Sequence, residues 1–352
     1  GGLDDFYPTQ LKVLGYMGNK DKLYALPYDN PTMVLAYRKD VFKKYKDEFQ
    51  QDMGYDWTPG PTMTWKQYYE AAKWITEKAK QGVITEVAYG TGNQAKQHDS
   101  LMNDFSNVLV ANGGKYFSKD DLGKIGSSDP GESAMTSDVA LKSARFYNKL
   151  LKVAAPGSTS WDWTGLAEAF ASGKLAMAPE WHEFSSMFEN ENKSKVAGKV
   201  GWTMLPKGKD RHANMFGGTG IGINKYSSNK EKKAAWLFLV WATSPQTQYM
   251  ILKSDAGGSA PVRQSVYDLP DVKKAMNHPD SKEAMEMPNM IPMKAVLKAW
   301  KPENAYYRPK IPQWPRVDTY IYTELSKMLA GQQSPKETVQ TIAEKSNEAT
   351  GN

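Results

Sequence analysis

The 352-residue sequence contains no cysteine, which excludes disulfide bonds, thiolate metal sites and a cysteine nucleophile together. Histidine is also scarce, and the four histidines lack the spacing of a metal site. The stretch HEFSS after Trp181 begins like a zinc-protease motif, but it has no second histidine. The sequence therefore predicts no metal site and requires no cofactor.

Long apolar runs and basic blocks are missing as well. The most apolar stretch, AAWLFLVWA, is far too short to span a membrane. The net charge is +6, yet the lysines are interspersed with acidic residues on expected helix faces, as on a solvated surface. Because no basic block is interleaved with aromatic residues, we expect no nucleic-acid partner.

Aromatic residues, in contrast, are abundant. Eleven tryptophans and nineteen tyrosines occur in a chain of which 40% is hydrophobic, enough to bury at least one large core. Four tryptophans recur at helical spacing within amphipathic segments, which predicts core positions for Trp65, Trp74, Trp236 and Trp241.

Strand-like and helix-like segments alternate along the chain. Strands are predicted at 22–28, 33–39, 86–91 and 174–178, and helices after Thr64, near 98–111, near 137–153 and from Asn229. This alternation favours an α/β architecture with mostly parallel sheets.

The stretch SWDWTGLAEAFASGKLAMAPEW contains three tryptophans at the ends of one helix–strand unit. Asp162 or Thr164 is expected to cap the helix. Trp161 and Trp163 then lie just before the helix, and Trp181 lies just past the strand. Because ligand crevices in α/β sheets lie at such element ends, this placement favours a cleft over a core position.

Five stretches, in this order, resemble the extracellular solute-binding proteins of carbohydrate ABC importers, the group that includes maltose-binding protein. They are KLYALPYDNPTMVLAYRKDVF, AFASGKLAMAPEW, GGTGIGINKYSSNKEKKAAWLFLVWATSP, SAPVRQSVYDLPDV and IPQWPRVDTYIYTELSKMLAGQQSPKETVQTIAEK. Each stretch alone is weak evidence for this family, but all five in register over nearly the whole chain are specific to it.

The resemblance implies a periplasmic-binding-protein type II fold, in which two α/β lobes close on a ligand about hinge crossovers. The implied crossings are residues 29–32, 217–220 and about 308–313. The implied N-terminal lobe comprises 1–29 and 220–308, and the C-terminal lobe comprises 30–219 and 309–352. Family members carry an earlier stretch that has no counterpart before KLYALPY, so we expect an incomplete N-terminal lobe whose missing part is cleaved or forms a separate piece.

Aromatic rings suit a sugar because its C–H faces are weakly apolar, while its hydroxyl groups need oriented donors and acceptors. The resemblance makes Trp181 the first choice for stacking, because the family often places an aromatic ring after its GKxAM strand. Trp161, Trp163 and Trp314 are further candidates. The alternative for each of these rings is packing within a lobe or along the hinge.

Polar candidates lie mainly at the expected crossings. Asp29 and Asn30 are placed to exchange hydrogen bonds with a sugar, although Asx residues before proline are also common in turns. Glu180 is an acceptor candidate, and so is Gln97, for which a solvated helix face is the alternative. Arg308 precedes the third crossing, and a salt bridge between the lobes is its alternative role.

The glycine-rich stretch FGGTGIGIN does not meet the GxGxxG dinucleotide fingerprint, and a strand rather than a helix follows it. Gly217, Gly218 and Thr219 are instead expected to let main-chain groups approach a ligand, with Phe216 stacking on it. A bulged strand is the alternative.

Three functions compete. The first is a non-catalytic receptor that captures an oligosaccharide between two lobes and delivers it to a membrane permease. The second, a glycoside hydrolase or lyase, needs two carboxylates across the scissile bond, and Asp162, Glu168, Glu180 and Glu183 lie near the proposed site. A nucleophile elbow, GxSxG, is missing. The third is a receptor for a polyamine or a peptide.

The resemblance favours the first of these functions. It implies a protein that is not an enzyme, acts as a monomer, and has ABC transporter permease subunits as partners. It also implies a location outside the cytoplasmic membrane, either lipid-anchored at the cell surface or periplasmic.

Overall fold

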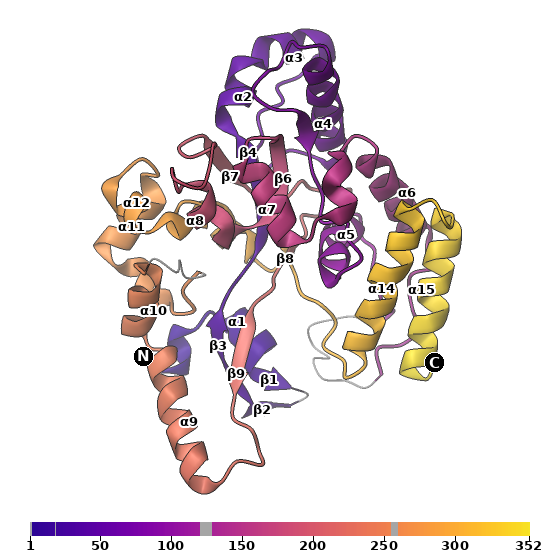
Figure 1. Cartoon of the computed structure of the whole chain (residues 1–352). Helices are drawn as coiled ribbons and strands as arrows, with labels where there is room; N and C mark the ends of the chain where they lie inside the picture. Colours follow the sequence, from indigo (N-terminus) through magenta and orange to yellow (C-terminus); the bar gives the residue numbers. More distant parts are fainter. Residues whose placement is uncertain (1, 18, 120–128, 255–259) are drawn as a thin grey trace.

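A computed structural model describes residues 2–17, 19–119, 129–254 and 260–352. Two bodies are visible in Figure 1, one around strands β4 to β7 and the other around β3 and β9. Among the described residues, no helix is both long and apolar enough to cross a membrane.

The larger body contains a four-stranded sheet in the order β5-β6-β4-β7. Its strands are β4 (Met33–Arg38), β5 (Tyr89–Thr91), β6 (Leu175–Trp181) and β7 (Val200–Thr203). Strand β4 is antiparallel to β6 and to β7, and only β5 and β6 are parallel within this sheet.

The prediction of mostly parallel sheets was therefore wrong. Met33, which begins β4, pairs with Trp181, which ends β6. Strand β4 starts at the segment that connects the two bodies, while β6 finishes there, so the two strands must run in opposite directions.

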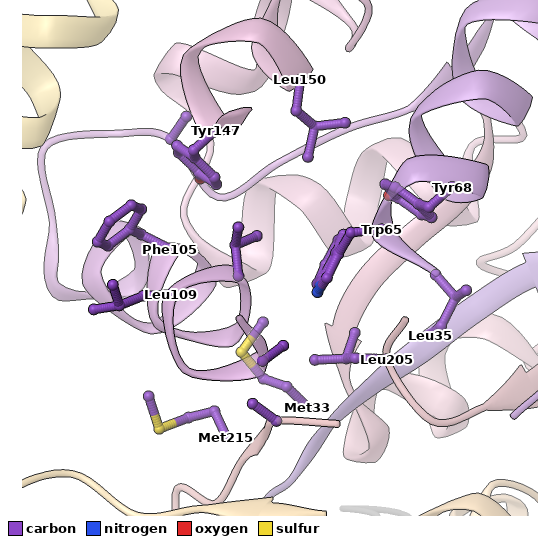
Figure 2. Close-up of a cluster of buried hydrophobic side chains, with 14 of the residues drawn as sticks. Met33, Leu35, Trp65, Tyr68, Phe105, Leu109, Tyr147, Leu150, Leu205 and Met215 are labelled. Atoms are coloured by element: carbon purple, nitrogen blue, oxygen red, sulfur yellow. The ribbon is translucent and has the colours of Figure 1, made fainter. Parts of the chain in front are cut away.

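The larger body also contains helices, some packed on the sheet and others packed on those helices (Figure 1). They are α2 (Lys39–Lys44), α3 (Lys46–Met53), α4 (Trp65–Lys80), α5 (Asp99–Ala111), α6 (Asp138–Leu151), α7 (Trp163–Ala171), α8 (Ser185–Phe188), α14 (Trp314–Leu329) and α15 (Pro335–Thr350). Side chains of β4 are buried on both faces of the sheet: Met33 and Leu35 join the cluster drawn in Figure 2, and Val34 and Ala36 join two others.

Local sequence signals place several of these helices. The Thr64 hydroxyl accepts from the Gln67 N–H at 3.2 Å, and the Gln67 side chain accepts from the Thr64 N–H at 2.9 Å, a capping box that starts α4. Asp162 caps α7 by accepting from the Gly165 N–H at 3.1 Å. Gly173, with φ of 80°, ends that helix, as the sequence predicts.

The smaller body is built on an antiparallel pair, β3 (Ala25–Asp29) and β9 (Thr219–Gly222). Around it lie α1 (Pro8–Gly15), β1 (Tyr16–Met17), β2 (Asn19–Leu23), α9 (Asn229–Ala242) and α10 (Pro245–Leu252). Its core includes Phe6, Leu11, Leu26, Leu239 and Val262.

Helix α9 departs from the sequence prediction. Trp65 and Trp74 are 4% and 6% exposed, as expected for core residues. Trp236 and Trp241 on α9 are 49% and 58% exposed, so the core prediction was wrong for them. The helix is apolar on several faces, but the described part of the smaller body covers only the face that carries Leu239 and Ala242.

A third group of elements links the two bodies. It comprises α11 (Pro270–Asn277), α12 (Lys282–Glu286), α13 (Met293–Ala299), β8 (Asn214–Met215) and β10 (Ala305–Tyr306). Its buried side chains form one cluster with Val34, Met204 and Phe216. The α11–α13 segment therefore packs against the larger sheet, as well as following the smaller body in the chain.

Candidate ligand-binding cleft

The segments predicted as crossings lie side by side. The Thr219 N–H donates to Asp29 Oδ1 at 3.0 Å, and the Gly217 N–H donates to the carbonyl oxygen of Pro31 at 2.8 Å. The Phe216 N–H donates to the carbonyl oxygen of Tyr306 at 2.9 Å, two residues before Arg308. Two main-chain hydrogen bonds and one main-chain to side-chain hydrogen bond thus join three stretches far apart in the sequence at the junction of the two bodies.

A cavity of about 350 Å³ opens at this junction. Its walls come from all three crossings and from α5, α7, β6 and the short 3-10 helix η4 (His182–Phe184). The lining residues are Pro31, Asp99, Asn103, Trp163, Trp181, Glu183, Phe184, Gly217, Thr219 and Arg308. Three aromatic side chains and several polar groups therefore face one space, the usual form of a small-molecule site.

The Trp181 ring is positioned by its close contact with Gly217. A Cβ atom at position 217 would lie 2.6 Å from Cζ3 of the indole, so only glycine leaves room for the ring. Trp181 is 7% exposed and its Nε1 is buried without a partner among the described residues. Trp163 is half-buried at the start of α7, with its ring edge-on to His98 at 4.7 Å.

Gly218 likewise leaves room for the ring of Phe216. A Cβ atom there would lie 2.3 Å from Cζ of Phe216. Phe216 itself is 3% exposed and packs on Tyr307 at 5.3 Å between ring centroids. It therefore lies in the core that links the two bodies rather than in the cavity wall.

Two predicted stacking residues lie outside the cavity lining. Trp161 is partly buried, and its ring packs against Gly157 and Gly165, where Cβ atoms would approach it to 2.4 Å and 2.9 Å. Trp314 begins α14 and meets Tyr116 edge-on at 5.5 Å.

Four polar candidates also lie outside the lining. Gln97 is exposed. Asn30 is fully buried and its Nδ2 donates to the carbonyl oxygen of Pro261 at 3.4 Å. Glu180 is fully buried, and its Oε1 accepts from the Trp181 N–H at 2.9 Å, so it supports the end of β6. Asp29 accepts from Thr219, and burial raises the pKa of its carboxyl.

The sequence prediction missed several residues that do line the cavity. Asn103 is 2% exposed, and its Oδ1 has no hydrogen-bond partner among the described residues. It lies on α5 together with Asp104 and Asn107, which are also buried. The sequence shows that these polar residues lie among apolar ones in α5, but it does not show that Asn103 faces the cavity.

Carboxyl groups near the cavity are held out of water and close to one another. Burial and the charge of Asp29 raise the pKa of Glu183 to about 8. Burial and the charge of Asp99 raise the pKa of Asp318 to about 7, although Arg308 acts to lower it. Within the described part of the chain, no group of three or more His, Asp or Glu side chains is arranged to hold a metal ion.

Two α/β bodies joined at adjacent crossings, with an aromatic and polar cavity at the junction, define a two-lobe solute-binding protein. A family model described as "Bacterial extracellular solute-binding protein" matches residues 2–249, and the chain belongs to this family. The resemblance noted from the sequence is confirmed. Membership supports a binding protein rather than a glycoside hydrolase or lyase.

One curated relative is a probable amino-acid ABC transporter periplasmic-binding protein of Sinorhizobium fredii, 24% identical over 337 residues. The alignment covers 95% of this chain and 65% of that relative, so the chain spans less than two thirds of the relative's length.

Solved structures share the fold of nearly all of this chain. Maltose-bound MalE3 of T. maritima is 26% identical with a TM-score of 0.74, over 97% of this chain and 76% of that one. An ABC transporter solute-binding protein of Agrobacterium radiobacter K84 in complex with ribitol is 27% identical with a TM-score of 0.75, over 99% and 76%. The predicted two-lobe α/β fold is confirmed.

Proposed function

We propose that this protein is the substrate-binding component of an ABC importer and that it captures a sugar, in particular an oligosaccharide, in the cavity at the crossings. The observation that carries the proposal is the joint placement of Trp163 and Trp181 with unpaired polar side chains in one cavity wall. Flat rings and oriented hydrogen-bonding groups are the two features that a sugar needs. The maltose and ribitol complexes of similar proteins support this ligand class.

Capture works by lobe closure. Contacts from both lobes favour the closed form, so the ligand shifts the population toward it. Permease subunits of the importer then recognise the closed, loaded protein. The protein acts as a monomer at the outer side of the cytoplasmic membrane, anchored by a lipid or free in the periplasm.

The sequence-derived site residues contribute to different degrees in this proposal. Trp163, Trp181, Gly217, Thr219 and Arg308 face the ligand directly. Asp29, Asn30, Glu180, Phe216 and Gly218 hold the crossings and the rings in place. Trp161, Gln97 and Trp314 contribute only to the flanks of the lobes.

Isothermal titration calorimetry against maltose, longer maltooligosaccharides, ribitol, an amino-acid mixture, a polyamine and a short peptide tests the proposal. Saturable binding of a sugar or polyol is expected, with no new reducing ends after long incubation. Binding of the amino acids, the polyamine or the peptide alone would contradict the ligand class. Turnover of a saccharide would favour the glycoside hydrolase or lyase instead.

A further inference from the structure

The two tryptophans of the cavity wall lie on different elements, and one loop contacts both of these elements. Trp181 ends β6, and Trp163 begins α7. The 92–98 loop connects β5 to α5, and hydrogen bonds join it to the end of β6 and to the segment before α7. The relative position of the two rings therefore depends on this loop as well as on β6 and α7 themselves.

Gln94 makes the contact between the loop and β6. Its Nε2 donates to Glu180 Oε1 at 3.1 Å and to the carbonyl oxygen of Pro179 at 3.3 Å. The same Glu180 oxygen accepts from the Trp181 N–H at 2.9 Å. One carboxyl oxygen thus joins the loop to the backbone of the residue that carries the ring.

This contact is fully buried. Gln94 and Glu180 are both 0% exposed, and neither is among the described residues that line the cavity. Their other oxygens, Gln94 Oε1 and Glu180 Oε2, are buried without a hydrogen-bond partner in the described part of the chain. Because a hydrogen bond is stronger in the protein interior than in water, the bond from Nε2 to Oε1 holds the two segments at one separation.

The other half of the loop holds the start of α7. The Lys96 N–H donates to the carbonyl oxygen of Trp161 at 3.1 Å, and Lys96 Nζ pairs with Asp162 Oδ2 at 2.9 Å. Asp162 caps α7, and Trp163 is the first residue of that helix. The His98 ring, at the end of the loop, meets the Trp163 ring edge-on at 4.7 Å between centroids. Both cavity tryptophans are therefore connected to this one loop.

Asp104 fixes the loop to α5. Its Oδ2 accepts from the Gln94 N–H at 3.3 Å, from Asn93 Nδ2 at 2.9 Å and from the Tyr147 hydroxyl at 2.8 Å. Asp104 is buried, and its neighbour Asn103 lines the cavity. Helix α5, which supplies part of the cavity wall, is thus attached to the same loop as both rings.

We propose that Gln94 is a positioning residue of the binding site and that, through Glu180, it sets the separation of the two cavity tryptophans. This inference rests on the proposed function, because the separation matters for a ligand that contacts both rings. Side chains outside a site control its affinity when they hold the contacting groups in the productive geometry. Gln94 and Glu180 act on the rings and do not touch the ligand.

Fluorine NMR of protein that contains 5-fluorotryptophan tests this role without a ligand. The resonances of Trp163 and Trp181 are assigned with Trp163→Phe and Trp181→Phe. Gln94→Leu keeps an apolar side chain of similar size but removes the donor, so both resonances are expected to shift. Unchanged resonances in a folded Gln94→Leu protein would overturn the proposal, and a shift confined to Trp181 would overturn the link to Trp163.

Two variants of Glu180 show whether the effect passes through this residue. Glu180→Gln keeps an oxygen that can accept from Gln94 Nε2 and from the Trp181 N–H, so both resonances should stay as in the wild type. Glu180→Leu lacks this oxygen and should shift both. Wild-type resonances in a folded Glu180→Leu protein would contradict the proposed route.

Gln248→Leu is the matched control, because it makes the same substitution at a buried glutamine outside the cavity. Gln248 Nε2 donates to the carbonyl oxygen of Ala242 at 3.1 Å, and its Oε1 accepts from the Val262 N–H at 3.1 Å. The control should lower the unfolding temperature and leave both tryptophan resonances in place. Shifts as large as those of Gln94→Leu would show that any lost buried hydrogen bond moves the rings, and the specific role of Gln94 would be lost.

Calorimetry with maltose and ribitol then measures the effect on binding. Gln94→Leu is expected to weaken whichever of these compounds the wild type binds by about tenfold or more, whereas Glu180→Gln and Gln248→Leu keep the affinity within about threefold. Equal affinity of the wild type and Gln94→Leu would overturn the role in binding. If neither compound binds the wild type, that result counts against the proposed function, while the fluorine resonances still decide whether Gln94 positions the rings.

Discussion

At the scale of single residues, the cavity combines an aromatic surface with unusual carboxyl groups. Trp181 is positioned by Gly217 and by the register of β6 against β4. Glu183 follows two residues later, without a side-chain hydrogen bond to the described residues. One short stretch of sequence thus supplies both an aromatic ring and a carboxyl group to the cavity wall.

Trp181→Ala should weaken sugar binding by about 1–3 kcal/mol, the scale of a lost buried aromatic contact at a binding site. Calorimetry with the tightest sugar found for the wild type measures the effect. Trp236→Ala is the matched control, because it removes a half-exposed ring on α9. An unchanged dissociation constant for the Trp181 variant would remove this ring from the site.

Glu183 should make the ligand-free protein less stable as the pH rises. A carboxyl whose pKa is higher folded than unfolded binds more protons when folded, so stability falls between the two values. The pKa of Glu183 is 4.5 in the unfolded chain and about 8 in the folded protein. The pKa of Asp318 is 3.8 unfolded and about 7 folded. Burial lowers the pKa of His182 from 6.5 to about 4, so His182 makes the folded protein more stable as the pH rises, but only below pH 6.5.

Urea unfolding from pH 6.5 to 8 measures this effect. We expect the free energy of unfolding to decrease over that interval in the wild type and to change less in Glu183→Gln. The same decrease in both proteins would show that another group is responsible.

Residue-level prediction from sequence succeeded where one element determines the environment. The cap at Asp162 and the position of Trp181 at the end of a strand could be read from local patterns. Asn103 and Asp99 could not, because their place in the cavity depends on how α5 packs against the crossings. No spacing rule in the sequence contains that tertiary information.

At the scale of elements, α9 shows a limit of periodicity. The run AAWLFLVWA predicts a buried helix, and the helix forms over Asn229–Ala242. Periodicity tells which residues prefer burial but not whether a covering element is present. Leu237 is 70% exposed and Leu239 is 5% exposed, although the two are chemically identical.

This contrast gives a test within one helix. Leu239→Ala should lower the free energy of unfolding by about 2 kcal/mol or more, because it leaves a cavity in the core. Leu237→Ala should change it by less than about 0.5 kcal/mol, since little apolar contact is lost. Chemical denaturation of the 352-residue chain measures both free energies of unfolding. Equal losses of stability in the two variants would mean that α9 does not bury the face that carries Leu239.

At the scale of the whole molecule, Thr32 ties distant segments together. Its N–H donates to His182 Nδ1 at 3.1 Å, and its carbonyl oxygen accepts from the His182 N–H at 3.0 Å. Its hydroxyl accepts from Trp300 Nε1 at 2.8 Å. The first crossing, the start of η4 and the C-terminal end of α13 are thus joined through one buried residue.

Thr32→Val keeps the side-chain shape but leaves Trp300 Nε1 buried without this acceptor, at a cost of about 1–3 kcal/mol. Thermal or urea unfolding measures the loss. Thr62→Val, at an exposed threonine, is the control and should have little effect. If both variants were equally stable, Thr32 would not be an important tie between these segments.

The order of motifs along the chain was sufficient to predict the two-lobe fold. The mutual direction of β4 and β6 was not predicted, because it follows from where each strand meets the junction. The division of the chain into lobes stays a prediction, and the packing of α11–α13 against Val34 and Met204 shows how closely the two bodies are connected.

The pairing of Trp181 with Met33 has a mechanical consequence. When one body rotates relative to another, atoms near the rotation axis are displaced least and atoms at the far rims most. In the lobe closure that we propose, Trp181, whose backbone pairs with the first residue after the first crossing, is therefore expected to move little. The ligand would then contact a Trp181 ring that is already in position, and closure would move mainly the outer parts of the two lobes.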